Sequence, residues 1–204
     1  MKTLIISSIA ALLLCFNTSS AQYSKENPSK ECFIGSTLFL LGNFAPTNKP
    51  DFAQLNFGYR LTEKDVVSIE LKTWKYAWSL GIPYRNSFEA EEEQFPGYIR
   101  EVGFAAAYQR FWWKGLYTGI HVMNAKQYFV DEERTVIKKG YQLFNTYRLG
   151  YHFKLFKESF FIEPSIAITH RAFHSEMPEK FKIKDDKWSK FFFGEPGMHF
   201  GFNF

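Results

Sequence analysis

The sequence predicts an all-β protein, an eight-stranded antiparallel up-and-down transmembrane β-barrel. Three observations predict this fold class. Apolar and polar residues alternate with a period of two along most of the chain, the connections between these segments are alternately short and long, and 20% of the 204 residues are aromatic. Phenylalanine alone occurs 24 times, an excess that calls for a physical cause.

The first residues, 1–21, have the pattern of a secretory signal peptide. A short positive head precedes an apolar run over Leu4–Phe16, and small residues lead up to Ala21. A lipoprotein signal at Cys15 is the alternative, although the residue before this cysteine is not small. Cleavage after Ala21 leaves a polar N-terminal leader at 22–31 and the β-barrel at 32–204.

Composition excludes several other classes of protein. The formal charge of +4 is small and scattered, which argues against nucleic acid as a partner. Two cysteines cannot build a disulfide scaffold or a cysteine-based zinc site. No later stretch reaches the 18 or so consecutive apolar residues of a membrane helix. The sequence also lacks HExxH, P-loop and dinucleotide fingerprints, so we expect no metal and no cofactor.

Eight segments carry the strand pattern. The clearest lies at 52–61, where Leu55, Phe57 and Tyr59 share one face while Asn56 and Arg60 share the other. The expected strands are 32–43, 52–61, 67–73, 101–109, 116–129, 143–153, 160–171 and 195–204.

The connections between these strands alternate in length. Those at 62–65, 113–115 and 154–159 are tight, and those at 44–51, 79–97, 130–140 and 173–189 are longer. Short turns at one end and long loops at the other are typical of a transmembrane barrel with periplasmic turns and extracellular loops. An even strand number places both ends of the barrel chain at the short-turn end.

The orientation of the two faces decides which solvent surrounds the barrel. An eight-stranded barrel has an interior just wide enough for its own side chains. If the apolar face points outward, the charged residues fill this lumen and must pair, because unpaired buried charge is costly. The opposite orientation gives a soluble, lipocalin-like carrier. Positive and negative charges nearly balance on the polar face, which favours a lumen ion-pair network of Arg60, Glu70, Lys72, Glu101, Arg148, Glu163, Arg171 and Glu195.

Aromatic residues concentrate at the expected membrane boundaries, as interfacial belts do. The belt at the turn end is expected to contain Phe57, Tyr59, Phe111, Trp112, Trp113, Tyr117, Phe153, Phe156, Phe160, Phe161, Phe202 and Phe204. Trp74, Tyr76 and Trp78 are expected to form the belt at the loop end. Arg100, Arg110 and His170 fall on the nominally lipid-facing side, where the two arginines can snorkel to the boundary.

The last strand carries a resemblance to a known family. Met198, Phe200, Phe202 and Phe204 alternate up to the final residue, and this pattern resembles the C-terminal signal that the barrel assembly machinery reads. The barrel region is similar to the small eight-stranded outer-membrane family that includes OmpX and the OmpA membrane domain. The resemblance implies the cell outer membrane as the location. It implies outer-membrane lipids, lipopolysaccharide and the assembly machinery as partners.

Eight-stranded outer-membrane barrels include enzymes, and the five histidines are therefore catalytic candidates. A site like that of the lipid A deacylases needs a His-x-Ser pair, and no histidine here has serine two residues later. His170 and His174, beside Ser175 near the expected extracellular rim, leave a lipid A-modifying site open as an alternative. His121, His152 and His199 fit the lumen network.

The expected function is structural, or surface contact through the long extracellular loops, without catalysis. A narrow pore is a further alternative. The acidic run 89–93 in the second long loop can attract divalent cations shared with lipopolysaccharide, although such runs are usually solvated loop residues.

Overall fold

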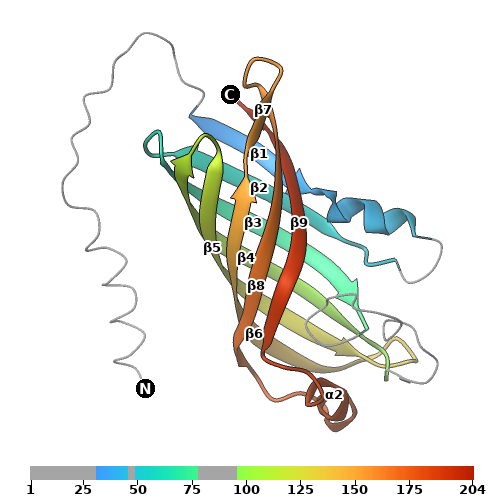
Figure 1. Ribbon diagram of the computed structural model, residues 1–204. Coiled ribbons are helices and arrows are strands. Elements are labelled where there is room, and N and C mark those ends of the chain that lie inside the picture. The colour runs from blue at the N-terminus through green and yellow to red at the C-terminus, as the bar shows by residue number, and fades with distance from the viewer. Residues whose placement is uncertain (1–30, 46–48, 78–95) are drawn as a thin grey trace.

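The computed structural model describes residues 31–45, 49–77 and 96–204. Its main feature is one antiparallel sheet that closes into a ring of eight strands (Figure 1). The expected signal peptide, almost all of the leader, Trp78 and the acidic run 89–93 lie outside the described residues. None of the described helices has the length and apolarity needed to cross a membrane.

Each strand pairs with its neighbours in chain order, and β9 returns to pair with β1. The strands are β1 (Cys32–Thr37), β2 (Ala53–Arg60), β3 (Asp65–Tyr76), β4 (Tyr98–Trp113), β5 (Leu116–Val130), β6 (Val136–Tyr151), β7 (Phe153–Leu155), β8 (Phe160–His174) and β9 (Phe191–Asn203). The short β7 continues β6 after His152, and both pair with β8, so they occupy one position in the ring. Two short helices complete the described structure, the 3-10 helix η2 (Leu38–Phe44) and α2 (Glu179–Asp185).

The alternation of residue types produces two different faces. In β3, Ile69 and Leu71 point outward with 59% and 55% of their surface exposed, while Glu70 between them is 5% exposed inside the ring. A strand places successive side chains on opposite faces, so this pattern repeats along each strand. The ring is therefore apolar outside and polar inside.

The turns that join β2 to β3, β4 to β5 and β7 to β8 lie at one end of the ring, together with the C-terminus (Figure 1). In the turn between β4 and β5, Lys114 and Gly115 adopt φ angles of 47° and 114°. A Cβ at Gly115 would stand 2.6 Å from the carbonyl oxygen of His152, so glycine is required both by the backbone angle and by the space. The expected turns at 62–65, 113–115 and 154–159 are confirmed.

The first expected strand, 32–43, is shorter than the sequence predicts. β1 ends at Thr37, whose hydroxyl accepts a hydrogen bond from the backbone N–H of Phe39 at 3.4 Å and caps η2. The physical reason is that alternation stops at Leu38, where four apolar residues follow one another. Period three then replaces period two.

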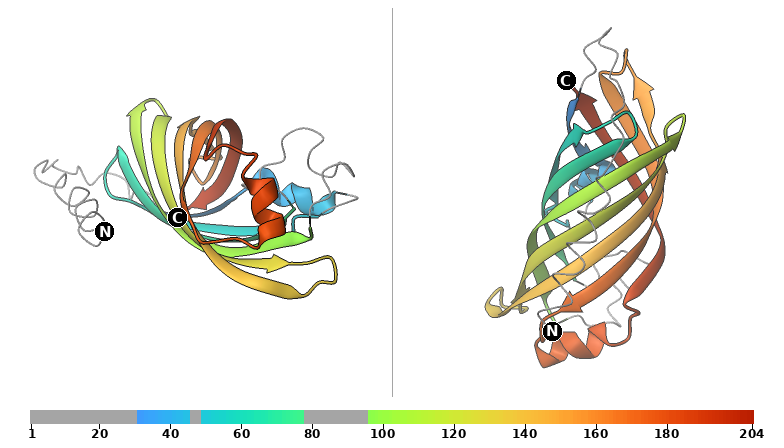
Figure 2. Two further views of the ribbon diagram at one scale, coloured as in Figure 1. Left: turned by 90° about the horizontal axis from the view of Figure 1, so that it is seen from below. Right: turned by 90° about the vertical axis from the view of Figure 1, so that its left-hand side faces the viewer.

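The expected long connection at 130–140 is also wrong. β5 and β6 extend toward each other, and only residues 131–135 join them. The Asp131 carboxylate accepts a hydrogen bond from the N–H of Thr135 at 2.8 Å, and Arg134 adopts a φ of 65°, which together close the turn. The connection at 173–189 contains α2, and Figure 2 shows this helix at the loop end of the ring.

Candidate functional site

The interior of the ring is the candidate site, because its buried polar groups converge there. At the loop end, the carboxylate of Glu101 is 1% exposed and accepts hydrogen bonds from the indole N–H of Trp74 and the hydroxyl of Tyr76, both at 3.0 Å. The amide of Gln142 donates a third at 2.5 Å, and the amide of Gln127 donates to the Tyr76 hydroxyl at 2.8 Å. We call these five residues the loop-end cluster. Its carboxylate is held by uncharged donors alone.

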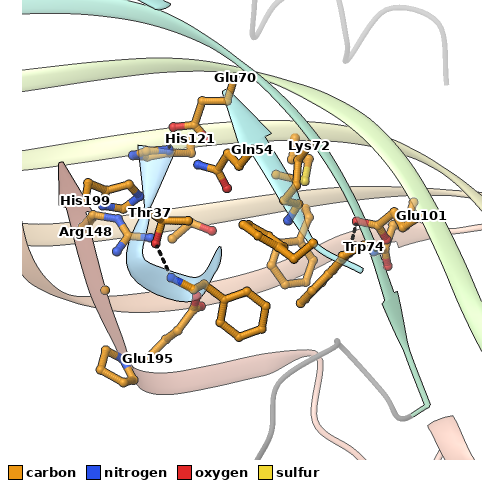
Figure 3. A pocket seen from close by; sticks show the side chains of 18 residues that line it. Thr37, Gln54, Glu70, Lys72, Trp74, Glu101, His121, Arg148, Glu195 and His199 are labelled. Carbon is orange, nitrogen blue, oxygen red and sulfur yellow. Dashed lines mark hydrogen bonds and ion pairs between the residues drawn. The ribbon is translucent and has the colours of Figure 1, made fainter. Parts of the chain in front are cut away.

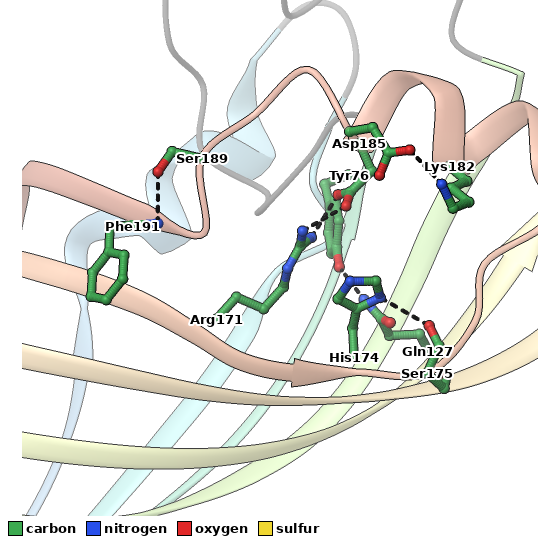
Figure 4. A network of polar contacts seen from close by, with 10 residues as sticks. Tyr76, Gln127, Arg171, His174, Ser175, Lys182, Asp185, Ser189 and Phe191 are labelled. Carbon is green, nitrogen blue, oxygen red and sulfur yellow. Dashed lines mark hydrogen bonds and ion pairs between the residues drawn. The ribbon is translucent and has the colours of Figure 1, made fainter.

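α2 packs over the loop-end cluster. Arg171 on β8 donates two hydrogen bonds of 2.5 Å to Asp185 of α2, and the two side chains are 4% and 8% exposed (Figure 4). An apolar contact accompanies this pair, since Met177 and Phe181 pack into a buried cluster with Tyr76, Ile99 and Phe129. The helix is therefore fixed to the ring by both charge and apolar burial.

The solvent side of α2 carries a different kind of ion pair. Lys182 Nζ lies 2.5 Å from the carboxylate of Asp186, and both side chains are at least half exposed. The hydrogen bond to Asp186 and its negative charge raise the pKa of Lys182 above its ordinary value. Such exposed pairs contribute little to stability.

The loop-end cluster borders a cavity of about 270 Å³ inside the ring, which we call the central cavity (Figure 3). Its lining combines aromatic and apolar side chains with charged ones. The lining includes Phe39, Phe52, Glu70, Lys72, Trp74, Glu101, Met123, Phe144, Thr146, Arg148, Glu195, Pro196 and Gly197.

The turn-end half of the interior is closed by histidine–carboxylate pairs. His121 Nδ1 lies 2.8 Å from Glu70, and His152 Nδ1 lies 2.7 Å from Glu163. Tyr117 is completely buried and fills the space over Gly150, where a Cβ would meet the Tyr117 ring. Trp74, Glu101 and Gln142 of the loop-end cluster and the His121–Glu70 pair of this layer both line the central cavity.

The eight residues of the expected lumen network all lie on the inward positions of their strands. Their hydrogen bonds, ion pairs and ring contacts, however, join them to partners outside the set. Among the acids, Glu70 and Glu163 pair with histidines, while Glu101 and Glu195 accept hydrogen bonds from uncharged donors. Among the bases, Arg148 donates to Ser165 and Arg171 pairs with Asp185. Arg60 and Lys72 lie over the rings of Phe111 and Trp74, respectively. Histidines, hydroxyls and rings thus take the place of the expected mutual ion pairs.

Several aromatics of the expected belts instead point inward. Tyr76, Tyr117 and Phe161 are 4%, 0% and 3% exposed, and Trp74 donates into the loop-end cluster. Their parity along the strands is that of the charged inward positions, a signal in the sequence that identifies them. Trp112 and Trp113, at 59% and 64%, are outward as expected.

The four residues of the expected assembly signal lie on the outer face of β9. Phe202 and Phe204 are 56% and 60% exposed, and Phe160 of the neighbouring β8 lies against Phe202 with ring centroids 4.9 Å apart. Phe200 and Met198 continue the same face toward the middle of the strand.

His170 and His174 do not form a shared site with Ser175. His170 stacks on Phe191 of β9 with centroids 4.1 Å apart, on the outer face of the ring. His174 Nδ1 contacts the backbone carbonyl of Ser175 at 2.9 Å, while the Ser175 hydroxyl oxygen accepts from the N–H of Tyr141. Among the described residues, no group of three or more His, Cys, Asp or Glu side chains can hold a metal ion.

The two arginines on the outer face have acidic partners near the strand ends. Arg110 pairs with Asp65 at 2.5 Å, and Arg100 lies 3.5 Å from Asp51. The Asp65 carboxylate also accepts hydrogen bonds from the hydroxyls of Tyr108 and Thr62, at 2.6 and 2.7 Å.

Comparisons of this chain with models of known protein families, with characterised proteins and with solved structures find no match.

Proposed function

We propose that this protein is an integral outer-membrane β-barrel that spans the membrane with its eight strands and acts through surface contact at its loop end. One observation carries the proposal: the ring is apolar outside and polar inside. Soluble proteins rarely expose large continuous apolar surfaces, because water makes them costly. Outward residues that are more than half exposed include Phe57, Ile69, Leu71, Val102, Phe104, Ile166, Phe173 and Phe202.

The dimensions and the distribution of aromatic residues support the same proposal. The 12 residues of β3, tilted by roughly 40°, cover about 30 Å, which matches an apolar membrane layer. At the turn end, Trp112, Trp113, Phe156 and Phe204 are all more than half exposed, as expected of side chains in an interfacial belt. The signal-peptide pattern and the resemblance to small outer-membrane barrels favour the outer membrane as the location.

The filled interior favours an anchoring role over a pore. The loop-end cluster and the histidine–carboxylate layer occupy the lumen on either side of the central cavity. The described elements at the loop end, α2 and the β5–β6 hairpin, are then the parts that face the cell exterior and meet a partner.

A pair of matched substitutions tests membrane insertion. Leu71→Arg places a charge in the middle of β3, and Ile183→Arg places the same charge on α2, at 55% and 54% exposure of the original residue. In a membrane, we expect Leu71→Arg to cost about 2–4 kcal/mol of unfolding free energy and Ile183→Arg to be nearly neutral. The measurement is urea unfolding in lipid vesicles, with the folded fraction read from heat-modifiable gel migration.

The same pair separates the proposal from a soluble carrier. If the outer face meets water, both substitutions are neutral and the purified protein folds without detergent or lipid. That outcome, with the protein in the soluble fraction of expressing cells, contradicts the proposal.

A further inference from the structure

In the described part of the chain, the strand wall of the ring is interrupted beside the central cavity, where β1 ends. β1 and β9 pair from Phe33 with Asn203 to Thr37 with His199, and the pairing stops there because β1 ends. β9 continues from Met198 back to Phe191 and pairs with β8 alone. Between this part of β9 and β2, the described chain closes the wall with η2 and not with a strand.

The helix η2 has two apolar sides. With about three residues per turn in a 3-10 helix, Leu38, Leu41 and Phe44 fall in one row, and they are 44%, 59% and 82% exposed. On the other side, Phe39 packs against Phe52 and Trp74, with ring centroids 4.8 and 5.9 Å apart. If the ring lies in a membrane, the exposed row meets lipid while Phe39 lines the cavity.

The central cavity contains residues from both sides of this interruption. Phe39 of η2 and Phe52, just before β2, line it from one side, and Pro196 and Gly197 line it from β9. Met123 and Phe144 on the opposite wall add an apolar surface. This lining suits a hydrocarbon chain.

The polar lining contains two cations, Lys72 and Arg148, that have no ion-pair partner among the described residues. Glu70, Glu101 and Glu195 each accept short hydrogen bonds from a histidine, from uncharged donors or from Thr169. Arg148 lines the cavity, and its guanidinium donates to the Ser165 hydroxyl at 2.9 Å. No described carboxylate lies within ion-pairing distance of Arg148 or Lys72. A ligand that fits this site therefore supplies a negatively charged acceptor.

The cavity volume limits the length of the apolar part. A protein cavity of about 150 Å³ accommodates benzene with its six carbon atoms, so by proportion 270 Å³ holds roughly eleven carbon atoms. Longer chains would have to extend through the interruption beside η2.

We propose that the central cavity binds a single-chain amphiphile with a carboxylate head and about ten to twelve carbon atoms. The carboxylate accepts from Arg148, and the chain lies among Phe39, Phe52 and Trp74. Binding goes beyond the proposed function, and the approach of the ligand from lipid past η2 is the one part that depends on membrane insertion.

The test is a titration of the full chain in phosphatidylcholine nanodiscs with radiolabelled dodecanoate, measured against empty nanodiscs. We expect one saturable site per chain. Arg148→Met removes the anion partner and should weaken binding about tenfold to a hundredfold. Thr146→Trp fills the cavity and should abolish binding. Lys126→Met removes a cation from the outer face of β5 and should leave binding unchanged.

Heat-modifiable migration shows first that each variant is folded, and Met123→Trp replaces Thr146→Trp if the latter does not fold. Absence of saturable binding, or equal affinity in all folded variants, overturns the proposal. Dodecanol binding as tightly as dodecanoate overturns the carboxylate assignment. Folding in water without lipid would contradict membrane insertion alone, since the same titration in buffer still tests the cavity.

Discussion

The pair formed by Arg171 and Asp185 makes a strong prediction about how α2 is held. Both side chains are almost completely buried, at 4% and 8% exposure, and two hydrogen bonds join them. Asp185→Asn leaves the guanidinium without its counter-charge in a buried site. Breaking a buried pair in this way costs about 3–5 kcal/mol. We expect α2 to detach before the ring unfolds, so the cost should appear first as opening of the helix.

Limited trypsin digestion measures this opening, since Lys180, Lys182 and Lys184 lie within α2. When cleavage follows rapid opening, its rate tracks the population of the open form. A loss of 3–5 kcal/mol is therefore expected to accelerate cleavage by about two to three and a half orders of magnitude, with an upper limit where α2 is open all the time.

The matched control is Asp186→Asn on the same helix. It removes the exposed pair with Lys182, and such solvated pairs contribute little to stability, so cleavage should accelerate by less than about threefold. Equal cleavage rates in Asp185→Asn and Asp186→Asn would refute the assignment of the buried pair as the main restraint on α2. The double variant Arg171→Met/Asp185→Leu should recover much of the protection, because both charges are removed together.

A further prediction concerns the turn end. Gly115→Ala should destabilise the protein by more than about 1 kcal/mol in urea unfolding in lipid vesicles, because the positive φ and the nearby carbonyl of His152 leave no room for a Cβ. Gly119→Ala is the control: the nearest neighbour lies 3.5 Å from the new Cβ, so stability should change by less than about 0.5 kcal/mol. Equal effects of the two substitutions would refute the role of the turn geometry.

The sequence predicts the strand faces well, because alternation is a local property. Leu71 and Glu70 are assigned to opposite sides by parity alone, and the structure agrees. Parity also places Trp74 and Tyr76 inside, but their aromatic character suggested a membrane belt. At Trp74 and Tyr76, position in the strand therefore predicts the inward orientation better than residue type does.

The strand ends and the contact partners could not be predicted in the same way. β1 stops at Thr37 because a run of apolar residues favours neither face, and the extension of β5 and β6 depends on pairing between the two strands. The partners of the lumen charges depend on strand register and tilt, which bring His121 to Glu70 across two strands. Asp185 reaches Arg171 only because α2 folds back over the ring, and no local pattern encodes this contact.

The junction between the first and last strands has a consequence for assembly. Five residue pairs join β1 to β9, whereas β5 and β6 are paired along nearly their whole length. The hairpins form between segments close in the chain, but this seam must bring together residues more than 160 positions apart, at a greater entropic cost. We therefore expect the pairing of β1 with β9 to be the last step in closing the ring.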